Sequence, residues 1–253
     1  MNEMQTKNFG FLSGNVLKII ACICMAIDHV GAILFPKIRM LRIIGRIAFP
    51  IFAFMIAEGC KYTKNRLRYF LTIFLLGVCF QIVYFIAENS LTMCIFITFS
   101  LSILIIYSLD ALKERIINKK STRSIFIAFA VFCIFVVGAY AICKTVSVDY
   151  GFLGVTVPVF ASLFNFRKDE LSNAVIKNQT VSRLLSVLCL LIGLIVMCLT
   201  KVKIQWYCLL AVPFLILYSG KRGRYNIKYF FYAFYPVHMV VIYGISILLN
   251  LLK

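Results

Sequence analysis

The run SIFIAFAVFCIFVVGAYAIC, residues 124–143, decides the fold class of this chain. It has no charged side chain, and a helix that crosses a membrane needs about 20 mainly apolar residues. The whole 253-residue chain has the same character, because 62% of it is apolar and 14% is charged, with a mean hydropathy of +0.96. Soluble domains have roughly 45–50% apolar and about 25% charged residues, which excludes a secreted or cytosolic globular protein. We predict a polytopic helical membrane protein.

Similar apolar runs recur along the chain and predict about nine membrane-spanning helices, within a range of 8 to 10. The second and eighth runs are short, which indicates tilted or partly buried helices. No soluble domain or repeat interrupts the runs, so residues 1–253 are predicted to form one all-α integral-membrane domain. The predicted helices occupy residues 16–36, 43–60, 67–87, 91–110, 124–143, 148–166, 183–200, 205–219 and 229–250.

Basic residues outnumber acidic ones, with 27 Lys and Arg against 9 Asp and Glu and a net charge of +18. On a soluble protein this balance would suggest a nucleic-acid partner. Here 19 of the 27 basic residues lie near the N-terminus and in the loops after the even-numbered predicted helices. Because cytoplasmic loops of membrane proteins accumulate Lys and Arg, the charge predicts a cytoplasmic N-terminus and no nucleic-acid partner.

Common catalytic and metal-binding motifs are missing from the sequence. It contains no Ser-His-Asp arrangement, no pair of histidines four residues apart and no Walker phosphate loop. The 10 cysteines lie in or beside apolar runs and form no CxxC pair. Buried free cysteines behave as small hydrophobic residues, so neither a disulfide nor a metal site is predicted.

A few ionisable side chains lie inside the predicted spans, where a charge costs several kcal/mol and usually serves a purpose. These candidate catalytic residues are Asp28, His29, Arg46, Glu58 and His238. The two histidines are the only ones in the chain, and histidine is the side chain that exchanges a proton near neutral pH. A rise of about 1.5 Å per residue predicts one level in the outer half of the membrane for Asp28, His29 and Arg46. It predicts the midplane for His238 and the cytoplasmic surface for Glu58.

Structural roles are the alternatives for the same residues. An ion pair between Asp28 and Arg46 would lock two helices together. Glu58 would be a solvated helix end, and His238 would make a structural hydrogen bond beside Tyr235. His29, next to a carboxylate in the chain, is the strongest functional candidate, although neighbours on a helix point about 100° apart.

The same residues lie in motifs that resemble the TraX family, and the likeness extends from about Lys18 to the last predicted helix. Residues 94–98 depart from the Asn-led pattern expected of the family, so a role for that Asn is missing here. The matching motifs are MAIDHVG (residues 25–31), LRIIGRIAFPIFAF (41–54), AEG (57–59), DYG (149–151) and FYPVH (234–238).

The resemblance implies a multi-pass acetyltransferase of the bacterial cytoplasmic membrane. TraX-type proteins are associated with N-terminal acetylation of conjugative pilin, and they are similar to membrane acyltransferases that use acyl-CoA and an intramembrane histidine. The implied donor is acetyl-CoA, the implied acceptor is an amine such as a pilin N-terminus, and membrane lipids surround the protein. No metal is implied.

The residues and the resemblance together predict a mechanism. His29 would be the general base, oriented by a carboxylate such as Asp28. Arg46 would pair with Asp28 or with charge that develops on the substrate. His238, or Tyr235 as a substrate-binding residue, would donate a hydrogen bond to the tetrahedral oxyanion.

Other functions remain open on the sequence. The nearest alternative within the enzyme class is O-acetylation of a glycan. A proton-coupled transporter would use the carboxylates and histidines as a relay, although the predicted helices show no inverted repeat. A non-catalytic scaffold of a conjugation apparatus is the third possibility.

Overall fold

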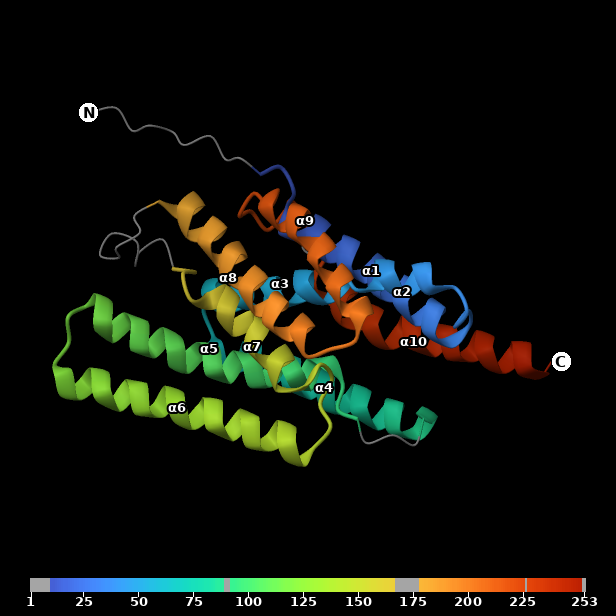
Figure 1. Cartoon of the computed structure of the whole chain (residues 1–253), viewed down its shortest axis with the longest axis horizontal. Helices are drawn as coiled ribbons and strands as arrows, with labels where there is room; N and C mark the ends of the chain where they lie inside the picture. The colour runs from blue at the N-terminus through green and yellow to red at the C-terminus, as the bar shows by residue number, and fades with distance from the viewer. Residues whose placement is uncertain (1–9, 89–91, 167–177, 226, 252–253) are drawn as a thin grey trace. The chain divides into compact units, whose positions relative to one another are not determined.

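The structure is a computed structural model, and it describes residues 10–88, 92–166, 178–225 and 227–251. Nearly all of these residues are helical, and the only β-type pairings among them are two isolated bridges. Figure 1 shows the helices in chain order from blue to red. They are α1 (Gly14–Ile33), α2 (Arg39–Gly45), α3 (Ala48–Tyr62), α4 (Arg66–Glu88), α5 (Ile95–Ile117), α6 (Thr122–Thr145), α7 (Gly151–Ser162), α8 (Gln179–Leu199), the 3-10 helix η2 (Lys203–Ala211), α9 (Val212–Ile216) and α10 (Lys228–Leu251). The all-α prediction is confirmed.

The protein is a multi-pass membrane protein, because 6 helices of its described part are long and apolar enough to cross a bilayer. The predicted number of about nine spans is therefore only approximate. Each of the nine predicted ranges nevertheless contains helix. The cytoplasmic N-terminus stays a prediction. The six candidate spans are Gly14–Ile33, Arg39–Tyr62, Ile95–Ile117, Thr122–Thr145, Gln179–Leu199 and Tyr229–Leu249.

The predicted spans 148–166 and 205–219 become shorter elements. The first contains α7, which has 12 residues, and the second contains most of η2 followed by the 5-residue α9. Most of α7 is buried, including Val155 and Val157 with 0% exposure, so its apolar side chains are covered by protein. High hydropathy shows only that a side chain favours leaving water. It does not distinguish a side chain buried in protein from one that faces lipid.

The chain divides into two compact units. The terminal unit consists of Met1–Phe52 and Val202–Lys253, and the central unit of Ala53–Lys201. The prediction of a single domain over the whole chain stays a prediction, and we describe each unit by itself.

In the terminal unit, α1 packs against α2 and α10, and η2 packs against α2 and α9. Helix α1 starts at the N-cap Ser13, whose hydroxyl accepts a hydrogen bond from the Val16 N–H at 3.4 Å. Just before this cap, the Leu12 N–H donates to the Leu217 carbonyl at 2.9 Å, and the Ser219 N–H donates to the Leu12 carbonyl at 2.8 Å. The start of α1 is thus attached to the segment after α9.

The contact between α1 and α2 is close because glycines lie in it. A Cβ atom on Gly45 would collide with the side chain of Asp28, and a Cβ on Gly31 would lie 2.6 Å from the Cβ of Leu41. Small residues allow two helix backbones to approach closely inside a membrane. This approach places the side chains of α2 directly over the second half of α1.

In the central unit, α5 packs against α4, α6 and α7, and α7 packs against α8. A fully buried hydroxyl joins two of these helices, because Ser102 on α5 donates to the Val155 carbonyl on α7 at 2.8 Å. Phe160 of α7 lies against Gly193 of α8, where a Cβ would be 3.0 Å from the ring. Helices α5 and α6 form a hairpin, which is clearly visible in Figure 1.

Candidate functional site

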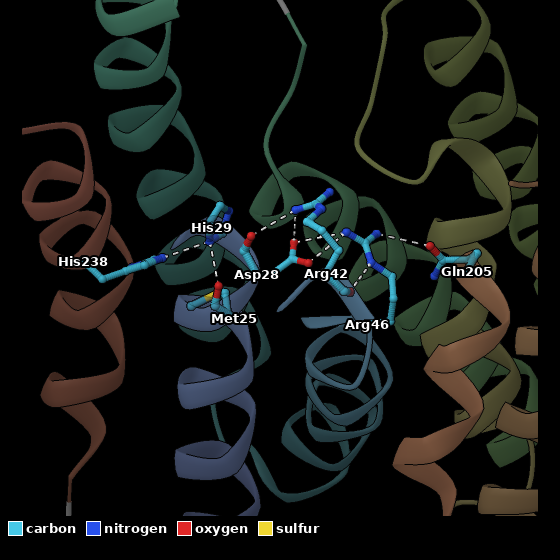
Figure 2. A network of polar contacts seen from close by, with 7 residues as sticks. All are labelled: Met25, Asp28, His29, Arg42, Arg46, Gln205 and His238. Atoms are coloured by element: carbon cyan, nitrogen blue, oxygen red, sulfur yellow. Dashed lines mark hydrogen bonds and ion pairs between the residues drawn. The ribbon is translucent and has the colours of Figure 1, made fainter. Parts of the chain in front are cut away.

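The candidate site lies in the terminal unit, and its first part is an ion-pair network between α1 and α2. Arg42 and Arg46 are four residues apart, which places both on the face of α2 that meets Asp28. Arg42 Nη1 lies 2.7 Å from Asp28 Oδ2, and Arg46 Nη2 lies 3.0 Å from Oδ1 and 3.1 Å from Oδ2. The Asp28–Arg46 ion pair that the sequence suggested is therefore present (Figure 2).

Further hydrogen bonds hold the two arginines in place. Arg42 Nη1 also donates to the backbone carbonyl of Asp28 at 3.2 Å, and Arg46 Nε donates to the carbonyl of Arg42 at 3.4 Å. Arg46 Nη1 donates to Gln205 Oε1 at 3.3 Å, and Gln205, on η2, is only 3% exposed. The Arg46 guanidinium thus lies between a carboxylate on α1 and an amide on η2 (Figure 2).

The second part of the site is a pair of histidines from α1 and α10. His238 Nε2 lies 3.2 Å from His29 Nδ1, and the ring centroids are 5.1 Å apart (Figure 2). Each ring also meets a carbonyl of its own helix, because His29 Nδ1 is 2.9 Å from Met25 O and His238 Nδ1 is 2.8 Å from Phe234 O. The only two histidines of the chain, 209 positions apart in sequence, are therefore in direct contact.

These contacts favour one assignment of protons for the neutral rings. A carbonyl oxygen only accepts, so each Nδ1 carries a hydrogen and donates to its carbonyl. A neutral ring that is protonated on Nδ1 has its lone pair on Nε2, and His238 Nε2 therefore accepts from His29 Nδ1–H. The remaining lone pair is on His29 Nε2, to which no described residue donates a hydrogen bond. That nitrogen is available to take a proton from a substrate.

Aromatic rings surround the histidine pair. The Phe234 ring stacks on His238 with a centroid distance of 5.1 Å and an interplanar angle of 12°. Tyr235 makes edge contacts with His29 and His238, at 6.3 Å and 5.4 Å between ring centroids. Tyr235 and His238 are 9% and 8% exposed, and His29 is half-buried. The stacked ring of Phe234 and the buried ring of Tyr235 restrict the orientation of the imidazole of His238.

The expected contact between Asp28 and His29 does not form. Asp28 pairs with arginines of α2, whereas the recorded hydrogen bonds of the His29 ring go to Met25 and His238. Neighbouring residues on a helix point about 100° apart, so the carboxylate and the imidazole face different helices. The side-chain partner of His29 is therefore His238, and not the Asp28 carboxylate that the sequence analysis suggested.

The comparisons with known proteins identify the family. Residues 13–246 match the family model described as TraX protein, and this range includes every residue of the site. This chain belongs to the TraX family. The resemblance seen in the motifs is thereby confirmed.

Two relatives of this TraX-family protein differ in how much of the chain they cover. The probable fimbrial assembly protein FimC, serogroup H1, of Dichelobacter nodosus is 27% identical over 260 residues, which is 94% of this chain and 96% of the relative. The uncharacterized protein RP591 of Rickettsia prowazekii (strain Madrid E) is 43% identical over 68 residues, 27% of this chain and 25% of the relative. No solved structure matches the chain.

Glu58 of this TraX-family chain has its partners in the central unit. Its carboxylate accepts from Asn165 Nδ2 at 2.9 Å, and Asn165 Oδ1 accepts from Lys61 Nζ at 2.8 Å. All three residues are 6% exposed, so the alternative of a solvated helix end is wrong for Glu58. Its assignment to the catalytic set stays a prediction.

Sequence reasoning overlooked two residues of the site, Arg42 and Gln205. Arg42 had a usable signal, because it precedes Arg46 by one helical turn and so shares its face. The sequence signal for Gln205 was weak, because a single neutral amide at the edge of an apolar run is common. No group of three or more His, Cys, Asp or Glu residues in the described part of the chain is arranged to hold a metal ion.

Proposed function

We propose that this TraX-family protein is an acetyltransferase of the bacterial cytoplasmic membrane. It transfers the acetyl group of acetyl-CoA to an acceptor amine, such as the N-terminus of a pilin or another membrane-presented peptide. The observation that supports this proposal most directly is the position of His29 Nδ1, which lies 2.9 Å from the Met25 carbonyl oxygen and 3.2 Å from His238 Nε2. One Nδ1–H shared between these two acceptors leaves the lone pair of the neutral ring on Nε2. A fixed, unprotonated imidazole nitrogen is what a general base requires.

In this mechanism His29 activates the acceptor. The acceptor nitrogen attacks the thioester carbonyl carbon, and its proton passes to His29 Nε2 as the carbon–nitrogen bond forms. The tetrahedral intermediate collapses, the carbon–sulfur bond breaks, and coenzyme A leaves as the thiol after taking that proton. His29 then has its free lone pair on Nε2 again. The atoms of the amine and of acetyl-CoA are all present in the amide product and the coenzyme A thiol.

His238 and Tyr235 have separate roles in this mechanism. His238 accepts the Nδ1–H of His29 and so orients the base, which is the role that the sequence had given to Asp28. The same hydrogen bond stabilises the imidazolium that forms. Because both nitrogens of His238 are engaged, it is a poor donor for the oxyanion. Tyr235, whose ring contacts both imidazoles, is the better donor.

A pilin-type acceptor is supported by the relative from Dichelobacter nodosus, whose name describes a probable fimbrial assembly protein. That similarity covers almost the full length of both chains. An acceptor amine from a pilus subunit is therefore the first one to test, with a glycan hydroxyl as the alternative acceptor for the same base.

The decisive experiment measures thiol release from acetyl-CoA by the purified protein with a peptide amine, together with the mass of the peptide. We expect release with the wild type and a loss of about 10²-fold or more in kcat for His29→Ala, because general bases contribute roughly 10²–10⁴-fold. Met40→Ala, at a position on α2 that is 63% exposed, is the matched control and keeps its activity. Equal turnover in His29→Ala and wild type, with both folded, would remove His29 from the mechanism.

A proton-coupled transporter is the second candidate, because two hydrogen-bonded imidazoles can pass a proton between helices. This function predicts proton flux in proteoliposomes without acetyl-CoA and no thiol release with any acceptor. Thiol release that depends on His29, without proton flux, contradicts it.

A further inference from the structure

The charges around Asp28 do not balance within the terminal unit. In residues 10–52 and 202–251, Asp28 is the only Asp or Glu, whereas two arginines are bonded to its carboxylate. The cluster of Asp28, Arg42 and Arg46 therefore has one positive charge in excess. Within a membrane-spanning segment such a charge is costly unless an anion accompanies it.

The excess charge belongs to Arg42. Arg46 Nη2 alone reaches both oxygens of Asp28, at 3.0 Å and 3.1 Å, and the rest of its guanidinium is bonded to Gln205 and a carbonyl. Arg42 uses only Nη1, and its Nε and Nη2 have no hydrogen bond to the residues that the structure describes. The Arg42 side chain is also 33% exposed, compared with 11% for Arg46.

A guanidinium with one nitrogen engaged still presents a planar edge with further N–H donors. That edge matches the two oxygens of a carboxylate or a phosphate, which accept a bidentate pair of hydrogen bonds. We propose that Arg42 is an anion-binding residue, which holds a carboxylate or phosphate group of the acceptor next to the amine that is acetylated.

The position of Arg42 relative to His29 favours the acceptor as the source of this oxyanion. Arg42 donates to both the carboxylate and the backbone carbonyl of Asp28, and Asp28 is the immediate neighbour of His29 in α1. An anion on Arg42 would therefore lie on the side of α1 next to the base, at the level of Asp28. The inference rests on the proposed function for the role of the ligand, whereas anion binding is measured without any acyl transfer.

The test is the labelling of arginines by phenylglyoxal in the purified full-length protein, followed residue by residue with mass spectrometry. Arg39, exposed on the same helix and without a recorded contact among the described residues, is the internal control. We expect inorganic phosphate to slow labelling of Arg42 several-fold and to leave labelling of Arg39 unchanged. Equal effects on the two arginines, no effect on either, or an Arg42 that does not react at all would each overturn the proposal.

Further arms of the experiment distinguish the sources of the oxyanion. A peptide amine with a free carboxylate should protect Arg42 better than the same peptide with an amidated C-terminus. Stronger protection of Arg42 by acetyl-CoA than by the peptide would overturn the assignment to the acceptor. Stronger protection in phosphatidylglycerol nanodiscs than in phosphatidylcholine nanodiscs would overturn it as well. Because labelling needs no catalysis, an absence of thiol release together with protection of Arg42 would contradict only the proposed function.

Discussion

At the scale of single residues, the site depends on which atom of each ring carries the hydrogen. The carbonyls of Met25 and Phe234 each receive an Nδ1–H, and this arrangement makes His238 Nε2 an acceptor for His29. A backbone carbonyl one helical turn earlier is thus enough to select the tautomer of each histidine. His238 is then a positioning residue that acts through His29.

This role predicts different effects for two replacements of His238. Glutamine can place a carbonyl oxygen near the former Nε2 and still accept from His29, whereas phenylalanine fills the space without an acceptor. We expect His238→Phe to lower kcat by about fivefold more than His238→Gln, because one lost hydrogen bond corresponds to about 1 kcal/mol. Steady-state kcat and KM of both variants measure this. Equal losses, or a change in KM alone, would contradict a role for His238 in orienting the base.

At the scale of elements, the approach of α2 to α1 is what brings two arginines onto Asp28. Gly45 lies in this contact, because any larger side chain would meet Asp28. The break between α2 and α3 occurs at Arg46, whose N–H donates to the carbonyls of Ile43 and Ile44 as the C-cap. The short helix α2 therefore ends at Gly45, one residue before Arg46, which contacts both carboxylate oxygens of Asp28.

Gly45→Ala is expected to disturb this contact. The added methyl group would push the two helices apart, and overpacking of this kind costs about 1–3 kcal/mol. Gly244→Ala on α10 is the control, because a Cβ there meets nothing within 4 Å. Thermal unfolding in detergent and thiol release should both decline for Gly45→Ala and stay unchanged for Gly244→Ala. A normal Gly45→Ala protein would mean that α1 and α2 tolerate a wider separation.

Another pair of elements is joined by the amide of Asn165, which links the end of α3 to the residues after α7. Hydrogen bonds to charged groups contribute roughly 1.5–3 kcal/mol, so Asn165→Leu should lower the free energy of unfolding by about 2 kcal/mol. Asn118→Leu, at the exposed C-cap of α5, is the matched control. Unfolding of the two variants side by side measures the difference, and equal stabilities would show that Glu58 and Lys61 find other partners.

At the scale of the whole molecule, the orientation in the membrane depends on where the basic residues lie. The connection between α5 and α6 contains Lys119 and Lys120, and the end of α6 has only Lys144. The distribution of positive charge predicts that the α5–α6 connection is cytoplasmic. A reporter inserted after Lys120 should therefore be cytoplasmic, and one inserted after Ser147 external. The reverse result, read with a fluorescent protein and an alkaline phosphatase, would invert the predicted topology.

Much of the fold and part of the site could be predicted from sequence because they depend on local composition. A lipid environment requires long apolar helices, so the runs near residues 124–143 and 183–200 correspond to α6 and α8. An ionisable residue inside such a run is rare, and this rarity singled out Asp28, His29 and His238. The lengths of α7 and η2 were not predictable in this way, since packing against other helices satisfies the same apolar side chains.

Local composition is enough to establish the membrane class, the helical segments and the short list of ionisable residues within them. Which of these residues meet depends on how the helices pack. The packing joined His29 to His238, gave Asp28 to Arg42 and Arg46, and added Gln205. The physical reason is that hydropathy determines which segments leave water. The rotation of each helix against its neighbours, set by close contacts such as that at Gly45, determines where its polar side chains point.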